Sequence, residues 1–145
     1  EKSYDIILFG MGNYGSAIAQ HLRAYNVRLL VVDFNHDEVG NWSAAGYDII
    51  YGDACDQEFI RHLPLKNVKW VFSAMPQHDI EFTHEDPRLV LIDSLKLAKF
   101  TGKIAISTQE VHEQEIFKKR GAHLVLLPSH DAADRAVEQI WVDFS

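Results

Sequence analysis

The chain alternates short runs of apolar residues with longer segments in which apolar residues recur every three or four positions. The short runs predict buried strands, and the longer segments predict helices with one apolar face. Strands are expected at 4–9, 27–32, 48–51, 68–73, 104–107 and 124–127. Helices are expected at 13–25, 35–45, 56–62, 87–99, 111–120 and 129–141. Apolar strands separated by helices form parallel sheets that are covered on both faces. The pattern therefore predicts an α/β fold, a Rossmann-like doubly wound parallel six-stranded sheet in a single domain over 1–145.

Several helix boundaries are marked by residues that begin or end helices. Asp86 precedes Pro87, and in this order the acid can cap the helix while proline takes its first position. Gly121 is expected to close the helix over 111–120. Asp131 falls in the first turn of the last helix, where a negative charge interacts favourably with the helix dipole.

A glycine-rich motif, Gly10-Met11-Gly12-Asn13-Tyr14-Gly15, lies between the first expected strand and the first expected helix. Gly10 permits a tight turn, Gly12 lets the backbone approach a pyrophosphate, and Gly15 lets the helix pack close to the sheet. The N-terminus of the helix then supplies unpaired N–H groups and the positive end of its dipole. Strand, glycines and helix together predict a phosphate-binding loop.

Asp33 ends the second expected strand, where dinucleotide-binding folds carry an acid that accepts hydrogen bonds from ribose hydroxyls. A carboxylate there repels a 2′-phosphate, and no arginine adjoins it in Phe34-Asn35-His36. We therefore expect NAD(H) or AMP/ADP as the ligand rather than NADP. The alternative is a glycine turn that binds no ligand, with Asp33 acting as an ordinary helix cap.

The net charge and the cysteine content limit which partners and which cellular compartment are expected. The formal net charge is −7, which opposes binding to the phosphate backbone of a nucleic acid. The one cysteine, Cys55, allows no internal disulfide and fits a reducing, cytoplasmic compartment. No apolar run is long enough to predict a membrane span. The chain starts without Met, and a strand is expected from Tyr4 onward, so we expect a domain excised from a larger protein.

No catalytic set can be assembled from the sequence by spacing, so we do not expect an enzyme. A polar stretch over 77–86 could gather a cation through His78, Asp79, Glu81, His84, Glu85 and Asp86. No histidine pair in it has the i, i+4 spacing of a zinc site, so a solvated loop is the preferred interpretation and no metal is expected. A lone Cys55 without a neighbouring base favours a small packed residue over a redox role.

Three segments at the ends of expected strands resemble one family. They are Gly10-Met11-Gly12-Asn13-Tyr14-Gly15, Val31-Val32-Asp33 and above all Tyr51-Gly52-Asp53-Ala54-Cys55-Asp56. They resemble RCK domains, the regulators of potassium conductance also called TrkA N-terminal domains. Pro64-Leu65, Ser73-Ala74-Met75-Pro76 and the tail from Gly121 to Asp134 are most similar to the cytosolic domains of monovalent cation:proton antiporters.

The resemblance implies a regulatory domain that binds NAD(H), AMP, ADP or ATP, dimerises, and opens or closes a linked membrane channel or transporter. It would be cytoplasmic, at the inner face of the membrane. Carried over by position, the phosphates would be lined by Gly10, Gly12, Asn13, Tyr14 and Gly15. Asp33, with Phe34 beside it, would hold the ribose; Asp53 and Ala54 would flank the adenine; Ser73 and Ala74 would cover the ribose–phosphate side.

Two departures from the family pattern leave alternatives open. The stretch over 77–86 is longer than in typical members and could be a lid, an interface or a loop. The chain also stops after the helix expected at 129–141, so the second lobe of full RCK domains is not in this sequence. The alternatives are a small NAD-dependent oxidoreductase domain with a pocket near Met75 and His78, or an interaction domain with a degenerate nucleotide site. The latter would dimerise through the helices over 88–99 and 111–120.

Overall fold

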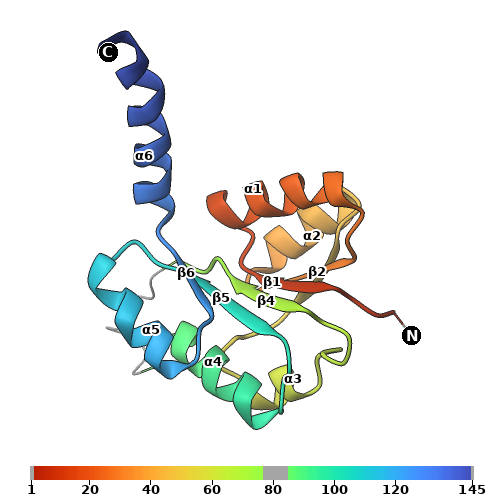
Figure 1. Ribbon diagram of the computed structural model, residues 1–145. Helices are drawn as coiled ribbons and strands as arrows, with labels where there is room; N and C mark the ends of the chain where they lie inside the picture. Colours follow the sequence, from red (N-terminus) through yellow and green to blue (C-terminus); the bar gives the residue numbers. More distant parts are fainter. Residues whose placement is uncertain (1, 77–84, 145) are drawn as a thin grey trace.

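The computed structural model describes residues 2–76 and 85–144. Its sheet has six strands, all paired in parallel, in the order β3-β2-β1-β4-β5-β6 (Figure 1). The strands are β1 Ile6–Phe9, β2 Leu29–Asp33, β3 Asp48–Tyr51, β4 Trp70–Ser73, β5 Lys103–Ser107 and β6 Leu124–Leu126. This order is that of the doubly wound dinucleotide-binding sheet, so the predicted fold is confirmed.

Helices cover both faces of the sheet (Figure 1). The first face carries α1 Asn13–Leu22 and α2 His36–Ala44, and the second carries α3 Gln57–Arg61, α4 Pro87–Leu97 and α5 Gln114–Arg120. A sixth helix, α6 Pro128–Trp141, follows β6. Short 3₁₀ turns are η1 Arg23–Tyr25, η2 Val111–Glu113 and η3 Val142–Phe144.

The two faces bury separate hydrophobic cores, because successive side chains of a strand point to opposite sides. On β1, Ile7 and Phe9 belong to the core under α3, α4 and α5, whereas Leu8 belongs to the core under α1 and α2. Ile92 and Leu95 of α4 are fully buried in the former. The sheet between these cores fixes where its strand ends lie, and those ends carry the predicted site.

The predicted helix caps are confirmed, and three strands, β1, β2 and β4, begin two residues later than expected. The Asp86 side chain accepts a hydrogen bond from the backbone N–H of Arg88, with Pro87 next to it. Gly121 ends α5 with a φ of +130°. The second strand starts at Leu29 because the backbone N–H of Arg28 donates to the Asp5 carboxylate instead of joining the ladder. The fourth starts at Trp70, after a turn over 65–68.

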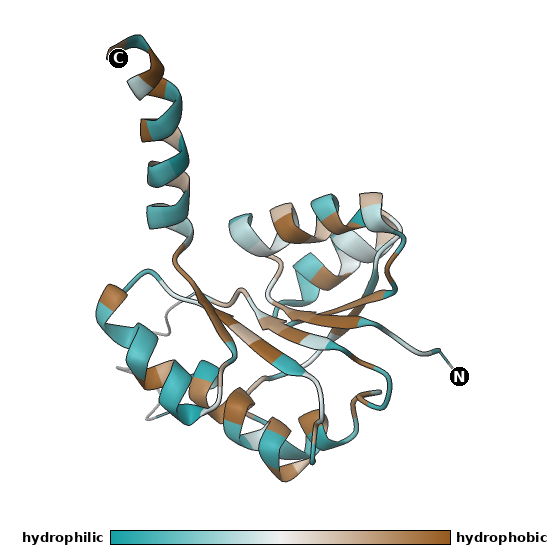
Figure 2. Ribbon diagram, viewed as in Figure 1, coloured by the Kyte–Doolittle hydropathy of each residue, from teal (hydrophilic) through white to brown (hydrophobic). Residues whose placement is uncertain are grey.

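The last helix projects away from the body of the domain (Figure 1). Every described residue from 129 to 144 is exposed. Residues coloured as hydrophobic recur along this helix (Figure 2), and the exposed hydrophobic residues include Val137, Ile140, Trp141 and Phe144. By contrast, most apolar residues of the helix over 87–97 are buried in the core of the domain. Of its leucines, only Leu97 is largely exposed. That makes α4 a poorer candidate for a dimer surface than its composition indicated.

Candidate nucleotide-binding site

The predicted phosphate loop lies where the strand order reverses, between β1 and β4. Gly10 has a φ of +99°, a conformation that other residues rarely adopt. A Cβ on Gly15 would lie 1.8 Å from the carbonyl oxygen of Gly10, so only glycine lets α1 approach the loop this closely. A Cβ on Gly12 would meet nothing within 4 Å. Gly10 and Gly15 therefore shape the loop, while Gly12 borders open space.

The start of α1 differs from the starts of the next three helices. The N-caps of α2, α3 and α4 are Asn35, Asp56 and Asp86, and each accepts hydrogen bonds from backbone N–H groups with its side chain. The N-cap of α1 is Gly12, which has no side chain to do this. The first N–H groups of α1, which include those of Asn13 and Tyr14, are thus left for an anion.

Asp33 is tied to the glycine loop. Its Oδ2 accepts a hydrogen bond from the backbone N–H of Met11 at 2.7 Å. Its backbone carbonyl accepts one from Gly52 at 3.1 Å, which joins the ends of β2 and β3. The carboxylate therefore positions the loop with one oxygen, and the second oxygen has no partner among the described residues. A ribose hydroxyl could donate to that second oxygen.

The segment after β3 is a tight turn in which Gly52 packs closely against Phe59. A Cβ on Gly52 would lie 2.1 Å from the ring of Phe59. The Asp53 carboxylate accepts a hydrogen bond from the N–H of Cys55, and Ala54 is buried. Asp53 does not cap α3, because Asp56 takes that role through the N–H groups of Glu58 and Phe59.

Ser73 and Ala74 follow at the end of β4, beside the glycine loop. The N–H of Ala74 donates to the carbonyl of Phe9 at 2.8 Å, and the Ala74 Cβ would be 3.3 Å from a Cβ on Gly15. The Ser73 hydroxyl is fully buried and has no hydrogen-bond partner in the described part of the chain. All the predicted site residues therefore lie at the carboxyl ends of β1 to β4, where open α/β sheets bind ligands.

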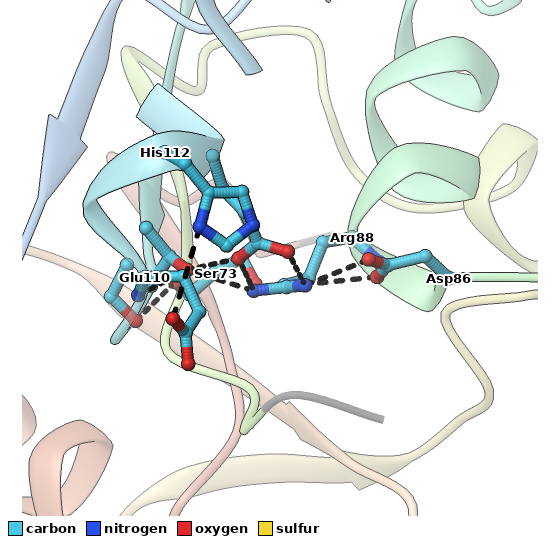
Figure 3. Close-up of polar contacts among 8 residues, drawn as sticks. Ser73, Asp86, Arg88, Glu110 and His112 are labelled. Carbon is cyan, nitrogen blue, oxygen red and sulfur yellow. Dashed lines mark hydrogen bonds and ion pairs between the residues drawn. The ribbon is translucent and has the colours of Figure 1, made fainter. Parts of the chain in front are cut away.

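Arg88 is a buried cation that the sequence analysis missed (Figure 3). Only 1% of the residue is exposed. Its guanidinium contacts the Asp86 carboxylate at 2.7 Å, both oxygens of Glu113 at 3.3 Å, and the Thr108 hydroxyl at 3.2 Å. It also lies 4.8 Å above the centre of the Phe117 ring.

These contacts keep Arg88 charged. Burial alone would lower its pKa, but the two carboxylates outweigh burial and raise the pKa of Arg88. A sequence signal for this position did exist. Arg88 shares the i, i+3, i+4, i+7 spacing of Leu91, Ile92 and Leu95, the buried face of α4.

Cys55 is not an activated thiol. Burial, followed by the negative charges of Asp53, Glu85 and Asp86, raises its pKa. A raised pKa reduces the fraction of thiolate and hence the reactivity of a cysteine. The same charges show that the turn after β3 faces the start of α4.

The described residues contain no candidate metal site, and they form a groove away from the predicted site. The polar stretch over 77–86, which was expected to be a solvated loop without a metal, falls mostly outside the described residues, since 77–84 are not among them. Within 2–76 and 85–144, no group of three His, Cys, Asp or Glu residues could hold a metal. An open groove of about 550 Å³ lies at the amino ends of β1, β2 and β3, lined by Tyr4, Arg23 and Tyr47 among others. It is therefore separate from the predicted site at the opposite edge.

The strand order, the glycine loop after β1 and the acid at the end of β2 together define a Rossmann-like fold. The chain belongs to the TrkA-N domain family, whose sequence profile it matches over residues 6–128. This confirms the family resemblance. Among the described helices, none is long and apolar enough to cross a membrane.

Known relatives share the whole domain at low identity. Ktr system potassium uptake protein C of Bacillus subtilis (strain 168) is 23% identical over 141 residues, covering 97% of this chain and 59% of that protein. The TrkA-N domain of the inner membrane protein ybaL from Escherichia coli superposes with a TM-score of 0.78 at 19% identity, covering 96% and 98% of the two chains. The GsuK channel bound to NAD superposes with a TM-score of 0.70 at 16% identity, covering 87% of this chain and 22% of that chain. GsuK has also been solved bound to ADP.

Proposed function

We propose that this is a regulatory domain that binds an adenine nucleotide, NAD(H) or AMP/ADP, and thereby controls a potassium or other monovalent cation transporter or channel. The observation that carries the proposal is the uncapped start of α1 beside Asp33, in a chain of the TrkA-N family. Backbone donors there would take the phosphates, and the second oxygen of Asp33 would take the ribose.

The proposed role in transport is supported by the kinds of protein that this chain resembles. One is a potassium uptake protein, one is a domain of an inner membrane protein, and one is a channel solved with NAD and with ADP. The chain spans 59% of the length of the first. By this proposal the domain acts at the cytoplasmic side of the membrane as a ligand-binding regulator and not as an enzyme. A cation:proton antiporter is the preferred kind of partner.

Dimerisation is the second part of the proposal. Val137, Ile140, Trp141 and Phe144 give α6 and the turn after it an apolar stripe that is exposed in the single chain. An exposed stripe of this spacing is typical of a helix that packs on another chain. A second copy of the domain would cover it and would let a nucleotide-dependent change in one copy reach the other.

Calorimetric titration of the domain with NAD⁺, NADH, NADPH, AMP, ADP and ATP tests the nucleotide site. We expect saturable binding of at least one adenine nucleotide, with NADPH weaker than NADH. Asp33→Asn should weaken binding about 10-fold or more, because a hydrogen bond to a charged group contributes roughly 1.5–3 kcal/mol. Asparagine still offers an oxygen to the N–H of Met11, so the loop should keep its shape.

Asp37→Asn is the matched control, since it removes the same charge from an exposed position in the first turn of α2. It should leave the affinity within about two-fold of the parent, far less than one hydrogen bond to a charged group contributes. Binding of none of the six nucleotides, or a preference for NADPH, would contradict the proposal. The regulatory part is tested in the assembled transporter, where Asp33→Asn should abolish the effect of the nucleotide on cation flux.

A further inference from the structure

Three rings form an exposed stack at the carboxyl ends of β2 and β3. The ring centres of Phe34 and Tyr51 are 5.3 Å apart, with 28° between the ring planes. Those of His36 and Tyr51 are 3.7 Å apart and almost parallel, at 4°. Phe34 is nevertheless 62% exposed and Tyr51 40% exposed. Tyr51 is thus shared by two neighbours, while much of Phe34 faces solvent.

This stack does not serve the folding of the domain in an obvious way. Neither Phe34 nor Tyr51 belongs to the hydrophobic core on either face of the sheet. Large aromatic side chains gain most of their stabilising free energy by burial, so two that are held in order yet left exposed point to a partner outside the folded chain.

The stack adjoins the residues proposed to bind the ribose and the base. Phe34 directly follows Asp33, and Asp33 is paired with Tyr51 across the sheet. The hydrogen bond from the N–H of Gly52 to the carbonyl of Asp33 holds the two strand ends together. A ribose on Asp33 therefore places its base within reach of Phe34 and of the turn at Asp53 and Ala54.

We propose that Phe34, backed by Tyr51 and His36, is the stacking platform for the base of the bound nucleotide. This inference rests on the proposed function and assigns the base its own subsite. Phe34 is the residue that contacts the base, whereas Tyr51 is a positioning residue that holds the Phe34 ring. Stacking uses the π face that every base has, so the platform distinguishes a nucleotide from a sugar phosphate rather than one base from another.

The test compares AMP with ribose 5-phosphate, which lacks only the base. Both are titrated into isotope-labelled domain and followed by the amide signals of Gly10 to Gly15. Phe34→Ala should weaken AMP about 10-fold, within the range measured when a stacking aromatic is removed. Ribose 5-phosphate should bind the variant and the parent with the same affinity to within about two-fold. In the parent, the adenine protons of bound AMP should show contacts to the Phe34 ring.

Two conservative variants, one variant that removes the Tyr51 ring and one distant control complete the test. Phe34→Tyr and Tyr51→Phe should restore parental affinity for AMP because each keeps its ring, whereas Tyr51→Leu should weaken AMP less than Phe34→Ala does. Tyr25→Ala is the matched control: Tyr25 is an exposed aromatic in η1, outside the proposed site. This variant should change neither the affinity for AMP nor the affinity for ribose 5-phosphate.

The outcomes separate this inference from the proposed function. If Phe34→Ala binds AMP as tightly as the parent, or loses AMP and ribose 5-phosphate equally, the platform is wrong while the phosphate–ribose site stands. If the parent binds none of NAD(H), AMP and ADP, the proposed function fails and the platform fails with it.

Discussion

The carboxyl ends of β1 and β2 and those of β4 and β5 lie along one edge of the same sheet, yet they are built differently. The first pair ends in a glycine loop and a helix whose N-cap, Gly12, has no side chain. The second pair ends beside a buried guanidinium, Arg88, which Asp86, Glu113 and Thr108 surround (Figure 3).

The difference separates a candidate ligand-binding region from a region whose polar groups are paired within the chain. Around Arg88, two carboxylates and one hydroxyl of the chain surround the guanidinium, so its charge and its hydrogen bonds need no partner from outside. Around Gly12, backbone donors and the positive end of a helix dipole are left without an internal acceptor, which favours an anion supplied from outside. Substitutions around Arg88 should therefore lower stability, whereas a substitution at Gly12 should remove ligand binding.

Arg88→Met should give the largest loss of stability. It leaves the largely buried carboxylates of Asp86 and Glu113 facing each other without their cation, and breaking a buried pair in this way costs about 3–5 kcal/mol. Urea unfolding measures the loss. Arg88→Met combined with Glu113→Gln should recover part of it, because one of the stranded charges is gone. A loss below about 1 kcal/mol would show that the network is no more than a surface ion pair.

Two glycines of the loop should respond oppositely to the same substitution. Gly15→Ala forces a Cβ onto the carbonyl of Gly10, and overpacking of this kind costs about 1–3 kcal/mol of stability. Gly12→Ala has room for its methyl group and a permitted φ of −70°, so the free energy of unfolding should stay nearly unchanged. The methyl group should nevertheless block the phosphates and abolish nucleotide binding. Equal effects of the two variants on stability, in thermal and urea unfolding, would contradict this division.

The smallest effect is expected at an exposed ion pair, Asp5 with Arg28. Hydrogen bonds from the side chain and then the backbone of Arg28 lower the pKa of Asp5 from 3.8 to about 2. A pKa that is lower in the folded state contributes stability above the unfolded value and loses it as the pH falls. The contribution should therefore disappear between about pH 4 and pH 2. Asp5→Asn should remove this part of the pH dependence, and a carboxyl signal of Asp5 titrating near pH 4 would contradict the assignment.

The phosphate loop and the buried arginine also differ in how far the sequence revealed them. The spacing of Gly10, Gly12 and Gly15 after an apolar run predicted the loop, because backbone geometry at those positions is a local matter. The role of Arg88 was missed, since its partners Thr108 and Glu113 lie far along the chain, in the segment just after β5 and in η2. Its place on the apolar face of α4 was readable, but a charge there has a meaning only once its partners are known.

The exposed ring stack sits between these two cases. Phe34 was predicted to be near the ligand from its position after Asp33. That Tyr51 stacks with Phe34, and His36 with Tyr51, could not be predicted, because strand register and the start of α2 bring these rings together.

By itself the sequence determined the alternation of strands and helices, the helix caps and the glycine loop, since these follow from hydrophobic periodicity and local backbone preference. Only the tertiary structure decided which side chains share the edge of the sheet. The tertiary structure also decided that α6 leaves the body of the domain and that the Asp33 carboxylate holds the loop. Such contacts join residues far apart in the chain, and their free energies depend on burial and distance, which no local pattern encodes.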